Sequence, residues 1–432
     1  MNKEEIEQYL ADFHKKEFPK SIARDMKVLP SKKIKVIIGP RRAGKTYYLY
    51  QLMADCKKNK KNILFLNFEN TKLFGINYKE IKEIINLNQR LFSIDIKDKP
   101  ILFLDEPQNV DLWERAVREL FDEGYDIYIS GSSSKLLSKE ISTSLRGRSL
   151  SYLLLPFSLK EYFKARDFNY SSLPNSEEKI SADKLFDEYT EFGGFPEVTL
   201  EKDKEQKIKN IESYFELTVF KDLVERYKIK DSFLIKWFLK SLASSYTKEY
   251  SINKMYLTLK SQGRKISKDE LYSYSSMVED SVFAFNLPKF SYSIRKNEPV
   301  SKIYLCDLGF VKIIETNEDI GKKMENLVFL QLLRNKPPLD ELFFWKNVQK
   351  EEVDFVIKEG KKIKKLIQVC KEINDEETKQ REIRALLKAS KELKCDDLVM
   401  ITSEYKGVEE TKWFDLKGKI KFIPIVKWLM EN

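Results

Sequence analysis

Histidine is almost absent from the sequence, and cysteine is scarce. The 432 residues include one histidine, His14, and four cysteines. The cysteines lie far apart, at Cys56, Cys306, Cys370 and Cys395. Zinc sites use Cys-x-x-Cys pairs or closely spaced histidines, and this sequence has neither pattern. We therefore exclude a zinc site of that kind and a histidine-based catalytic triad, and we expect scattered reduced thiols.

Long apolar runs are also lacking. No segment approaches the ~18 apolar residues of a membrane-spanning helix. The first residues, 1–5, carry charges in place of the apolar core of a signal peptide. We therefore expect a cytoplasmic protein without a membrane partner.

Charged residues, by contrast, are abundant. They make up 34% of the chain beside 42% hydrophobic and 12% aromatic residues, which is typical of a folded, soluble protein. The length predicts two or three domains, each with its own core. The formal net charge of +10 favours a polyanionic partner, although charges spread this widely also serve solubility alone.

A phosphate-binding loop is the clearest motif. Gly39-Pro40-Arg41-Arg42-Ala43-Gly44-Lys45-Thr46 matches G-x-x-x-x-G-K-T, follows the apolar run 34–38 and precedes a segment with helical periodicity. We predict that Gly39, Pro40, Arg41, Arg42, Ala43, Gly44, Lys45 and Thr46 bind a nucleoside triphosphate. Backbone N–H groups and the helix dipole would hold the phosphates. Lys45 would reach the β- and γ-phosphates, and Thr46 would bind Mg²⁺.

A pair of acids follows a second apolar run. In Ile101–Glu106, four apolar residues precede Asp105 and Glu106. A buried parallel strand here would bring Asp105 to the Mg²⁺ beside Thr46, and Glu106 would polarise the attacking water. Asn67, at the end of the apolar run 62–69, either orients the catalytic carboxylate or is a satisfied amide at a strand end.

Three further polar residues are candidates for catalysis. Ser132 follows an apolar run at 127–131 and is a candidate γ-phosphate sensor, with helix capping as the alternative. Arg146 and Arg148 lie on a predicted turn. Either arginine is a candidate finger that enters a neighbouring subunit's site in a homo-oligomer, or part of a basic surface turn. Alternating strand and helix patterns predict a parallel α/β sheet covered on both faces.

The motifs and their order resemble the archaeal and bacterial AAA-type P-loop ATPases that carry a winged helix and a C-terminal PD-(D/E)XK nuclease-like domain of the DUF4143 type. The resemblance covers nearly the whole chain. Besides the phosphate loop, the segments that carry it are Leu104–Gln108, Gly131–Ser134, Leu145–Arg148, Leu155–Glu161 and Gly193–Glu197. The resemblance implies that the nucleotide is ATP. No residue pattern in the sequence reads the base, so the preference for adenine comes from the resemblance alone.

The resemblance and the local patterns together predict four domains. They are an ATPase core with an N-terminal helix (1–165), a helical lid and connector (166–230), a winged helix (231–312) and an α/β restriction-endonuclease-like domain (313–432). In the winged helix, helices are expected near 235–245, 251–263 and 267 onward, and two wing strands at 290–296 and 301–305. Its basic residues favour DNA, with a protein-docking module as the alternative: Lys254, Lys260, Arg264, Lys265, Lys268, Arg295 and Lys296.

The C-terminal domain departs from the nuclease pattern that it resembles. Glu325 on a helix and Asp354 on a strand match the pattern, but Gln368 and Cys370 stand where it has an acid and a lysine. A neutral amide binds Mg²⁺ weakly, and a thiol cannot replace an ammonium. Lys371 points to the opposite face from Gln368, because strand side chains alternate. We expect a binding platform without nuclease activity.

The sequence therefore predicts an ATP- and Mg²⁺-dependent ATPase that couples its nucleotide state to binding or remodelling of DNA. Two alternatives remain open. One is a slow, nucleotide-dependent switch that recruits a protein partner, and the other is an active metal-dependent nuclease.

Overall fold

The computed structural model of the chain divides into two compact units. It describes residues 2–56, 62–95, 97–131, 145, 147–171, 173–292, 300–314, 319–373 and 375–432. The first unit comprises Met1–Pro156 with Asp280–Val282, and the second comprises Phe157–Glu279 with Phe283–Asn432. Within these described ranges, no helix is both long and apolar enough to cross a membrane. All four cysteines are free.

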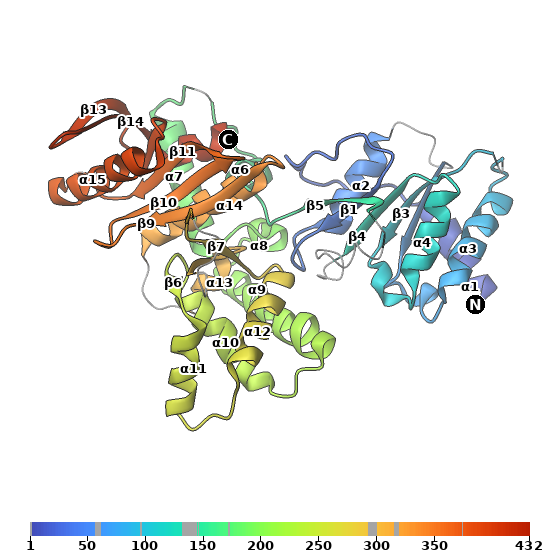
Figure 1. The fold of residues 1–432 in the computed structure, drawn as a ribbon. Helices are drawn as coiled ribbons and strands as arrows, with labels where there is room; N and C mark the ends of the chain where they lie inside the picture. The colour runs from blue at the N-terminus through green and yellow to red at the C-terminus, as the bar shows by residue number, and fades with distance from the viewer. Residues whose placement is uncertain are drawn as a thin grey trace. The chain divides into compact units, whose positions relative to one another are not determined.

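The first unit contains a parallel α/β sheet, as predicted. Its described strands are ordered β2-β3-β4-β1-β5, and all neighbours are parallel (Figure 1). The bounds are β1 (Ile34–Ile38), β2 (Ile63–Asn67), β3 (Ile101–Asp105), β4 (Ile127–Gly131) and β5 (Ser149–Leu153). The helical segments are α1 (Lys3–Lys15), α2 (Lys45–Asp55), η2 (Thr71–Leu73), α3 (Tyr78–Leu91), η3 (Pro107–Asn109) and α4 (Trp113–Asp122). Strand β5 has no counterpart among the predicted strands, since its half-exposed residues lack an apolar run.

Alternate strand residues feed two separate cores in the first unit. One core joins the side of the sheet that carries Leu64, Leu102 and Leu104 to α1, α3 and α4. The other joins Phe65 and Phe103 to α2 and to the segment before β1. This burial on both faces explains why the central strands are continuous apolar runs. The parallel order places every strand's carboxyl end on the same edge of the sheet, where β1 and β3 deliver the predicted site residues.

The second unit begins with helices and a small antiparallel sheet. Its helical segments up to the small sheet are α6 (Leu159–Ala165), α7 (Ser176–Phe192), α8 (Pro196–Leu200), α9 (Lys204–Leu217), the π-helix η4 (Thr218–Glu225), α10 (Ser232–Ser244), α11 (Ile252–Ser261) and α12 (Lys268–Asp280). The small sheet has the order β6-β8-β7, from β6 (Glu249–Tyr250), β7 (Ala284–Pro288) and β8 (Ser301–Leu305). Of the strand expected at 290–296, residues 293–296 lie outside the described residues. The described strand that pairs with β8 ends at Pro288, so the prediction was placed too late.

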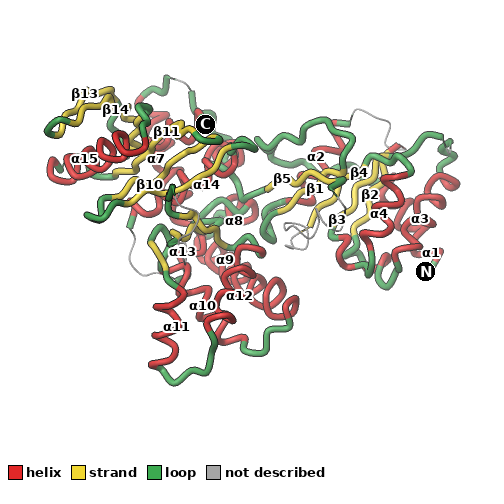
Figure 2. The backbone as a smooth tube through the Cα atoms, viewed as in Figure 1, coloured by secondary structure: helices red, strands yellow, loops and turns green. Residues whose placement is uncertain are grey.

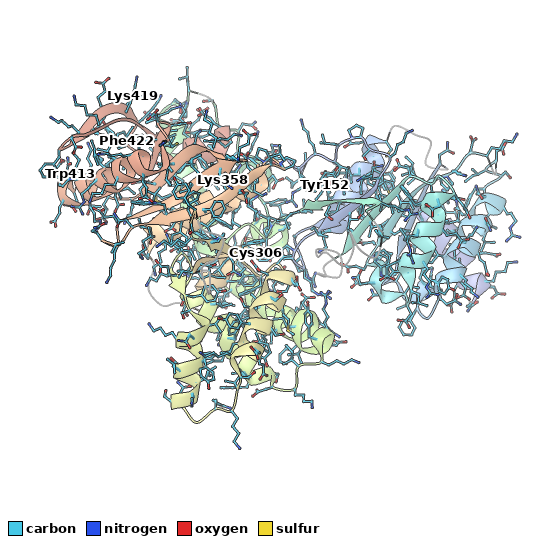
Figure 3. The ribbon with its side chains drawn as sticks, in the orientation of Figure 1. Tyr152, Cys306, Lys358, Trp413, Lys419 and Phe422 are labelled. Carbon is cyan, nitrogen blue, oxygen red and sulfur yellow. The ribbon has the colours of Figure 1, made fainter. Side chains whose placement is uncertain are left out.

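A mixed sheet forms the rest of the second unit (Figure 2). Its described strands are ordered β13-β14-β12-β11-β10-β9. They are β9 (Asp340–Lys346), β10 (Glu352–Glu359), β11 (Lys362–Cys370), β12 (Leu398–Thr402), β13 (Gly407–Trp413) and β14 (Leu416–Pro424). The remaining helices are α13 (Gly309–Lys312), α14 (Ile320–Arg334), α15 (Glu376–Leu393) and α16 (Ile425–Glu431). On β14, exposed Lys419 and buried Phe422 show that one face is covered and the other is open (Figure 3).

A buried aspartate holds the Gly193-Gly194 turn in the second unit. Asp307 accepts hydrogen bonds from the N–H groups of Gly194 at 2.7 Å and Gly309 at 2.8 Å. A Cβ on Gly193 would lie 1.7 Å from Asp307 Oδ1, and one on Gly194 would lie 2.4 Å from the Phe157 carbonyl oxygen. The glycines are therefore required for close packing. The role of this region as a lid on the nucleotide stays a prediction.

Candidate functional site

The phosphate loop joins β1 to α2 and has the backbone that its sequence requires. Arg42 (φ 64°) and Gly44 (φ 89°) both lie in the left-handed region. A Cβ on Gly39 would lie 2.0 Å from the carbonyl oxygen of Leu154, just after β5. The loop can therefore approach β5 only with glycine at position 39, whereas Gly44 supplies the turn into α2.

Lys45 and Thr46 begin α2 and point toward different partners. Lys45 Nζ donates to the carbonyl oxygens of Gly39 at 3.1 Å and Pro40 at 2.9 Å, so its ammonium lies across the loop. Thr46 Oγ1 donates to Asp105 Oδ2 at 2.7 Å. The residues predicted to bind Mg²⁺ are thus adjacent, although they are 59 positions apart in sequence.

Asp105 is the most buried acid of this site. It is 2% exposed at the end of β3, and Ser130 Oγ at the end of β4 donates to its other oxygen. Burial, and next the charge of Glu106, raise the pKa of Asp105 to about 6. Two adjacent acids in a buried position are an excess of negative charge that a divalent cation would offset. The residues present therefore fit Mg²⁺ at Thr46 and Asp105.

Glu106 is held by its backbone and by one side chain. Its φ of 52° places a non-glycine residue in the left-handed region, and its N–H donates to the Ser130 carbonyl at 2.8 Å. Gln108 Nε2 donates to Glu106 Oε2. Strained backbone of this kind persists only where surrounding contacts impose it, and it is frequent at functional sites. Sequence reasoning included Gln108 in a family motif but gave it no role, because its contact with Glu106 depends on the turn after β3.

The segment before β1 braces the phosphate loop, and sequence reasoning missed this as well. The Arg24 guanidinium donates to the carbonyl oxygens of Ala43, at 2.8 Å, and Leu155. The backbone N–H of Arg24 donates a hydrogen bond to Gln51 Oε1, on α2, at 3.2 Å. A lone arginine in an irregular segment gives no pattern that marks such a contact. Asn67 Oδ1 accepts from the Glu69 N–H at 2.9 Å, which is the strand-end alternative.

The other predicted catalytic residues lie elsewhere or outside the described ranges. Ser132 and Arg146 are outside the residues that the structure describes. Arg148 pairs with Asp122 at 3.1 Å and precedes β5, whose first residue Ser149 is in register with Ile34. Arg148 is thus at the amino edge of the parallel sheet, opposite its own phosphate loop. It could serve a nucleotide site only in another subunit.

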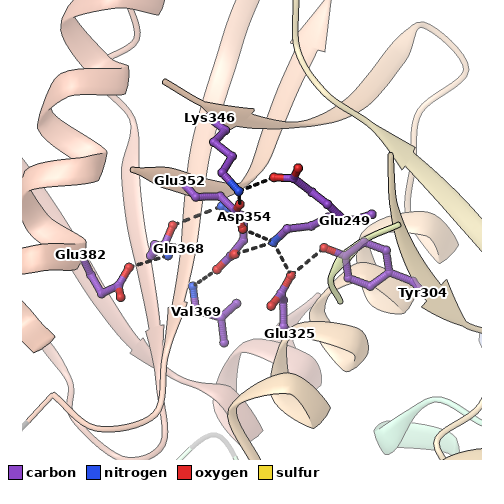
Figure 4. A network of polar contacts seen from close by, with 10 residues as sticks. Glu249, Tyr304, Glu325, Lys346, Glu352, Asp354, Gln368, Val369 and Glu382 are labelled. Carbon is purple, nitrogen blue, oxygen red and sulfur yellow. Dashed lines mark hydrogen bonds and ion pairs between the residues drawn. The ribbon is translucent and has the colours of Figure 1, made fainter. Parts of the chain in front are cut away.

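The C-terminal sheet brings together two of the acids that the nuclease resemblance singled out. Glu325 of α14 and Asp354 of β10 both contact the ammonium of Lys302, from β8 (Figure 4). The side chain of Gln368 accepts from the Asp354 N–H at 3.1 Å and donates to Glu382 at 2.7 Å. Burial raises the pKa of Cys370 to about 11, so this thiol stays protonated near neutrality. No sequence pattern indicated Lys302 or Glu382.

Comparisons with known proteins agree with the first unit's geometry. The AAA domain family matches residues 31–163. Two families described as domains of unknown function, DUF8612 and DUF4143, match residues 183–319 and 320–426.

Two relatives match nearly the whole chain. An uncharacterized protein of Methanocaldococcus jannaschii is 39% identical over 413 residues, 95% of this chain and 91% of the relative. An uncharacterized protein of Haemophilus influenzae is 29% identical over 415 residues, 92% of this chain and 94% of the relative. A solved structure, a STAND signal-transduction ATPase with a tetratricopeptide repeat sensor from Pyrococcus horikoshii, covers 77% of this chain and 45% of its own at 12% identity. Its TM-score of 0.24 is too low to support an argument.

The fold and the phosphate loop define a P-loop protein of the AAA type. The chain belongs to the family of the M. jannaschii protein, an AAA-type P-loop ATPase family with a DUF4143 domain in its C-terminal part. Membership of this family implies nucleotide binding.

Proposed function

We propose that this protein hydrolyses ATP with Mg²⁺ and couples its nucleotide state to binding or remodelling of DNA. The observation that carries the catalytic part is the direct contact of Thr46 with Asp105, next to Glu106 and the phosphate loop. These groups come from three different elements, α2, β3 and the turn after β3. Their convergence on one edge of the sheet is the arrangement that phosphoryl transfer requires.

Each residue has a separate task in this proposal. The N–H groups of the phosphate loop and the Lys45 ammonium hold the phosphates and offset their charge. Thr46 and Asp105 would hold Mg²⁺, which supplies Lewis-acid stabilisation of the phosphates when it is bound. Glu106, oriented by Gln108, accepts a hydrogen bond from the attacking water and directs it.

The DNA part rests on a basic face in the second unit, on α11, the following turn and the start of α12. The segment α10 to β8 has helix, short strand, two helices and two antiparallel strands, an order that supports a winged helix. Five basic side chains there are exposed, and within the described ranges none has an ion pair with an acid: Lys254, Lys260, Arg264, Lys265 and Lys268. The ammonium groups of Lys260 and Lys268 lie 5.8 and 5.5 Å from the centroid of the Tyr256 ring. Basic groups interleaved with an aromatic ring suit a nucleic-acid backbone. Arg295 and Lys296, predicted at the wing tip, lie outside the described residues.

The test compares ATP hydrolysis and DNA affinity in matched variants. Lys45→Ala should abolish nucleotide binding, whereas Glu106→Gln should keep ATP bound and slow its hydrolysis. Replacing Arg264, Lys265 and Lys268 by Ala should weaken binding to duplex, forked and four-way DNA alike. It should also reduce the slope of log affinity against log salt by about one for each phosphate that is no longer neutralised. ATP affinity of this triple variant should equal that of the wild type.

The same measurements separate the alternatives. If the protein shows no salt-dependent DNA binding, or if the slope of log affinity against log salt is unchanged in the triple variant, a protein-binding switch is favoured. The degenerate nuclease-like domain would then serve as the platform of that switch. Cleavage of plasmid DNA with Mg²⁺ or Mn²⁺, abolished in Asp354→Asn, would favour a nuclease. An ATPase rate that no DNA structure changes would contradict the coupling.

A further inference from the structure

One lysine side chain of the second unit is buried together with its ammonium group. Lys302 lies in the middle strand of the small sheet, β8, and is 3% exposed. A buried ammonium is costly unless carboxylates and hydrogen bonds compensate for the missing hydration. The groups around it therefore show what this position is built to hold.

Three carboxylates from two other elements converge on the Lys302 ammonium. Glu325 Oε1 of α14 lies 2.8 Å from Nζ, Glu352 Oε1 of β10 lies 2.5 Å away, and Asp354 Oδ1 of β10 lies 3.1 Å away (Figure 4). The ammonium donates hydrogen bonds to Glu325 and Asp354, and Glu352 adds an ion pair. The pocket thus surrounds one cation with oxygen ligands, which is how proteins bind divalent ions as well.

Contacts with other groups also hold the three carboxylates in place. Tyr304 OH donates to Glu325 Oε1, the oxygen that also contacts Lys302, at 2.7 Å, and the Val369 N–H donates to the second oxygen of Asp354 at 2.9 Å. Lys346 pairs with the second oxygen of Glu352 at 3.2 Å, on the outer side of the pocket. The acids are therefore oriented by contacts that do not involve Lys302.

The charges in the pocket do not balance at one to one. Three acids face one fully buried ammonium, and Lys346 contributes only at the rim. Burial lowers the pKa of Lys302, but Glu325 and the other acids outweigh it, so the lysine stays charged. Three carboxyl groups that converge on one point are the set of oxygen ligands that a divalent cation takes.

We propose that Lys302 is a tethered substitute for a divalent metal ion, which fills the pocket of Glu325, Glu352 and Asp354 and excludes a metal from it. With Lys302 in this position, no group of three or more acids, cysteines or histidines among the described residues could hold a metal ion. An ammonium brings the positive charge but has no open coordination position for a water or a phosphate oxygen. The pocket therefore cannot activate water for phosphodiester cleavage. Instead, it fastens β8 of the small sheet to α14 and β10.

The proposal is independent of ATP and DNA binding, so its test uses nucleotide-free full-length protein and Mn²⁺ alone. Lys302→Met removes the ammonium at similar side-chain length. This variant should bind one more Mn²⁺ ion per chain than the wild type, at a concentration at least tenfold below any wild-type binding, measured from the decrease of the free-ion EPR signal. Mn²⁺ should also raise the thermal unfolding temperature of the variant by several degrees and leave that of the wild type unchanged, because a ligand stabilises the state that binds it.

Three further variants make the result unambiguous. Lys312→Met removes a lysine that pairs with Glu191 at 2.7 Å outside the pocket, and it should gain no Mn²⁺ ion. Adding Glu325→Gln and Asp354→Asn to Lys302→Met should abolish the new site. A folded Lys302→Met protein with wild-type Mn²⁺ binding would overturn the proposal. If that variant does not fold, Mn²⁺ binding of the wild type is compared with that of Glu325→Gln. Equal Mn²⁺ binding supports the proposal that Lys302 takes the place of a metal ion. A bound ion in the wild type that disappears in Glu325→Gln overturns the proposal.

Discussion

Gln108 illustrates how one side chain can set the chemistry of another. It donates to the carboxylate of Glu106, which the left-handed backbone already presents at the end of β3. This hydrogen bond fixes the direction of the carboxylate. A glutamine two positions after an acid is common in any sequence, so only the turn geometry reveals the pairing.

We predict that Gln108→Leu lowers the ATP hydrolysis rate about 10- to 100-fold with little change in ATP affinity, because general-base positioning contributes to the transition state alone. Glu106→Gln should cost more, since it removes the base itself. The measurement is single-turnover hydrolysis beside equilibrium nucleotide binding. A fall in affinity as large as the fall in rate would show that Gln108 supports the loop instead.

Asp307 should make the second unit's stability depend on pH. Burial raises its pKa to about 7, against the hydrogen bonds from Gly194 and Gly309 and the charge of Arg334. The folded state then holds a proton that the unfolded state releases near pH 4. Between about pH 4 and 7 the folded state binds more protons, so its free energy of unfolding falls as pH rises and levels off above pH 7.

The expected change is on the order of a few kcal/mol across that window. Asp307→Asn should lose this part of the pH dependence, while it is less stable at pH 5 because an amide accepts only one of the two N–H groups. The comparison is thermal unfolding of both proteins from pH 4 to 8. Parallel profiles for the two would mean that Asp307 does not titrate in this range.

At the scale of elements, the strands that carry the site were the easiest part to predict. β1 and β3 are buried on both faces, so each is largely a continuous apolar run, and the polar site residues begin where that apolar run ends. β5 was missed because it is only half-buried and has no such run. The strand paired with β8 was misplaced because apolar alternation continues past Pro288, and only pairing selects the register.

The site's supporting contacts could not be predicted for a different physical reason. Arg24 reaches Ala43 and Leu155 across 19 and 131 positions, and Lys302 reaches Asp354 across 52. Such contacts depend on tertiary packing, and a single basic residue has no periodicity that reveals its partner. The phosphate loop was recognisable because all of its groups are consecutive.

The approach of the phosphate loop to β5 gives a prediction at this scale. Gly39→Ala should destabilise the first unit by roughly 1–3 kcal/mol, because the added methyl group would lie 2.0 Å from the rigid Leu154 carbonyl oxygen. Gly321→Ala is a matched control in the first turn of α14, where the nearest atom, Asp319 Oδ1, is 3.3 Å away. It should be neutral or stabilising by up to about 1 kcal/mol. Equal unfolding temperatures for both variants would contradict the packing role of Gly39.

For the whole molecule, the net charge of +10 does not show which basic groups a partner can reach. Lys35, Lys45, Lys207 and Lys302 are at least nine-tenths buried, and Lys35, Lys207 and Lys302 form ion pairs inside the fold. The basic groups of α11 and α12, by contrast, are exposed. The net charge alone therefore cannot identify a surface for a polyanionic partner, because the positions of the charges matter. For this reason the DNA proposal depends on particular exposed lysines and arginines.

Arg148 carries the prediction about assembly. All strands of the first sheet run in parallel, and Arg148 precedes Ser149, which pairs with Ile34 at the start of β1. The phosphate loop follows Ile38 at the other end of β1, roughly 13 Å away along the strand. Arg148 cannot complete its own site. If it is a finger, it acts on a neighbouring subunit after leaving Asp122.

We therefore predict that the ATPase rate per chain rises with protein concentration, and that Arg148→Ala lowers it by about 10³-fold or more, the usual effect of removing such a finger. Mixing Arg148→Ala chains with Lys45→Ala chains should restore part of the activity, because the first supplies an intact phosphate loop and the second an intact arginine. Arg118→Ala on α4 is the control and should leave the rate unchanged. If Arg148 forms only a local ion pair, Arg148→Ala and Asp122→Asn should behave alike, with small decreases in stability, a rate independent of concentration and no rescue on mixing.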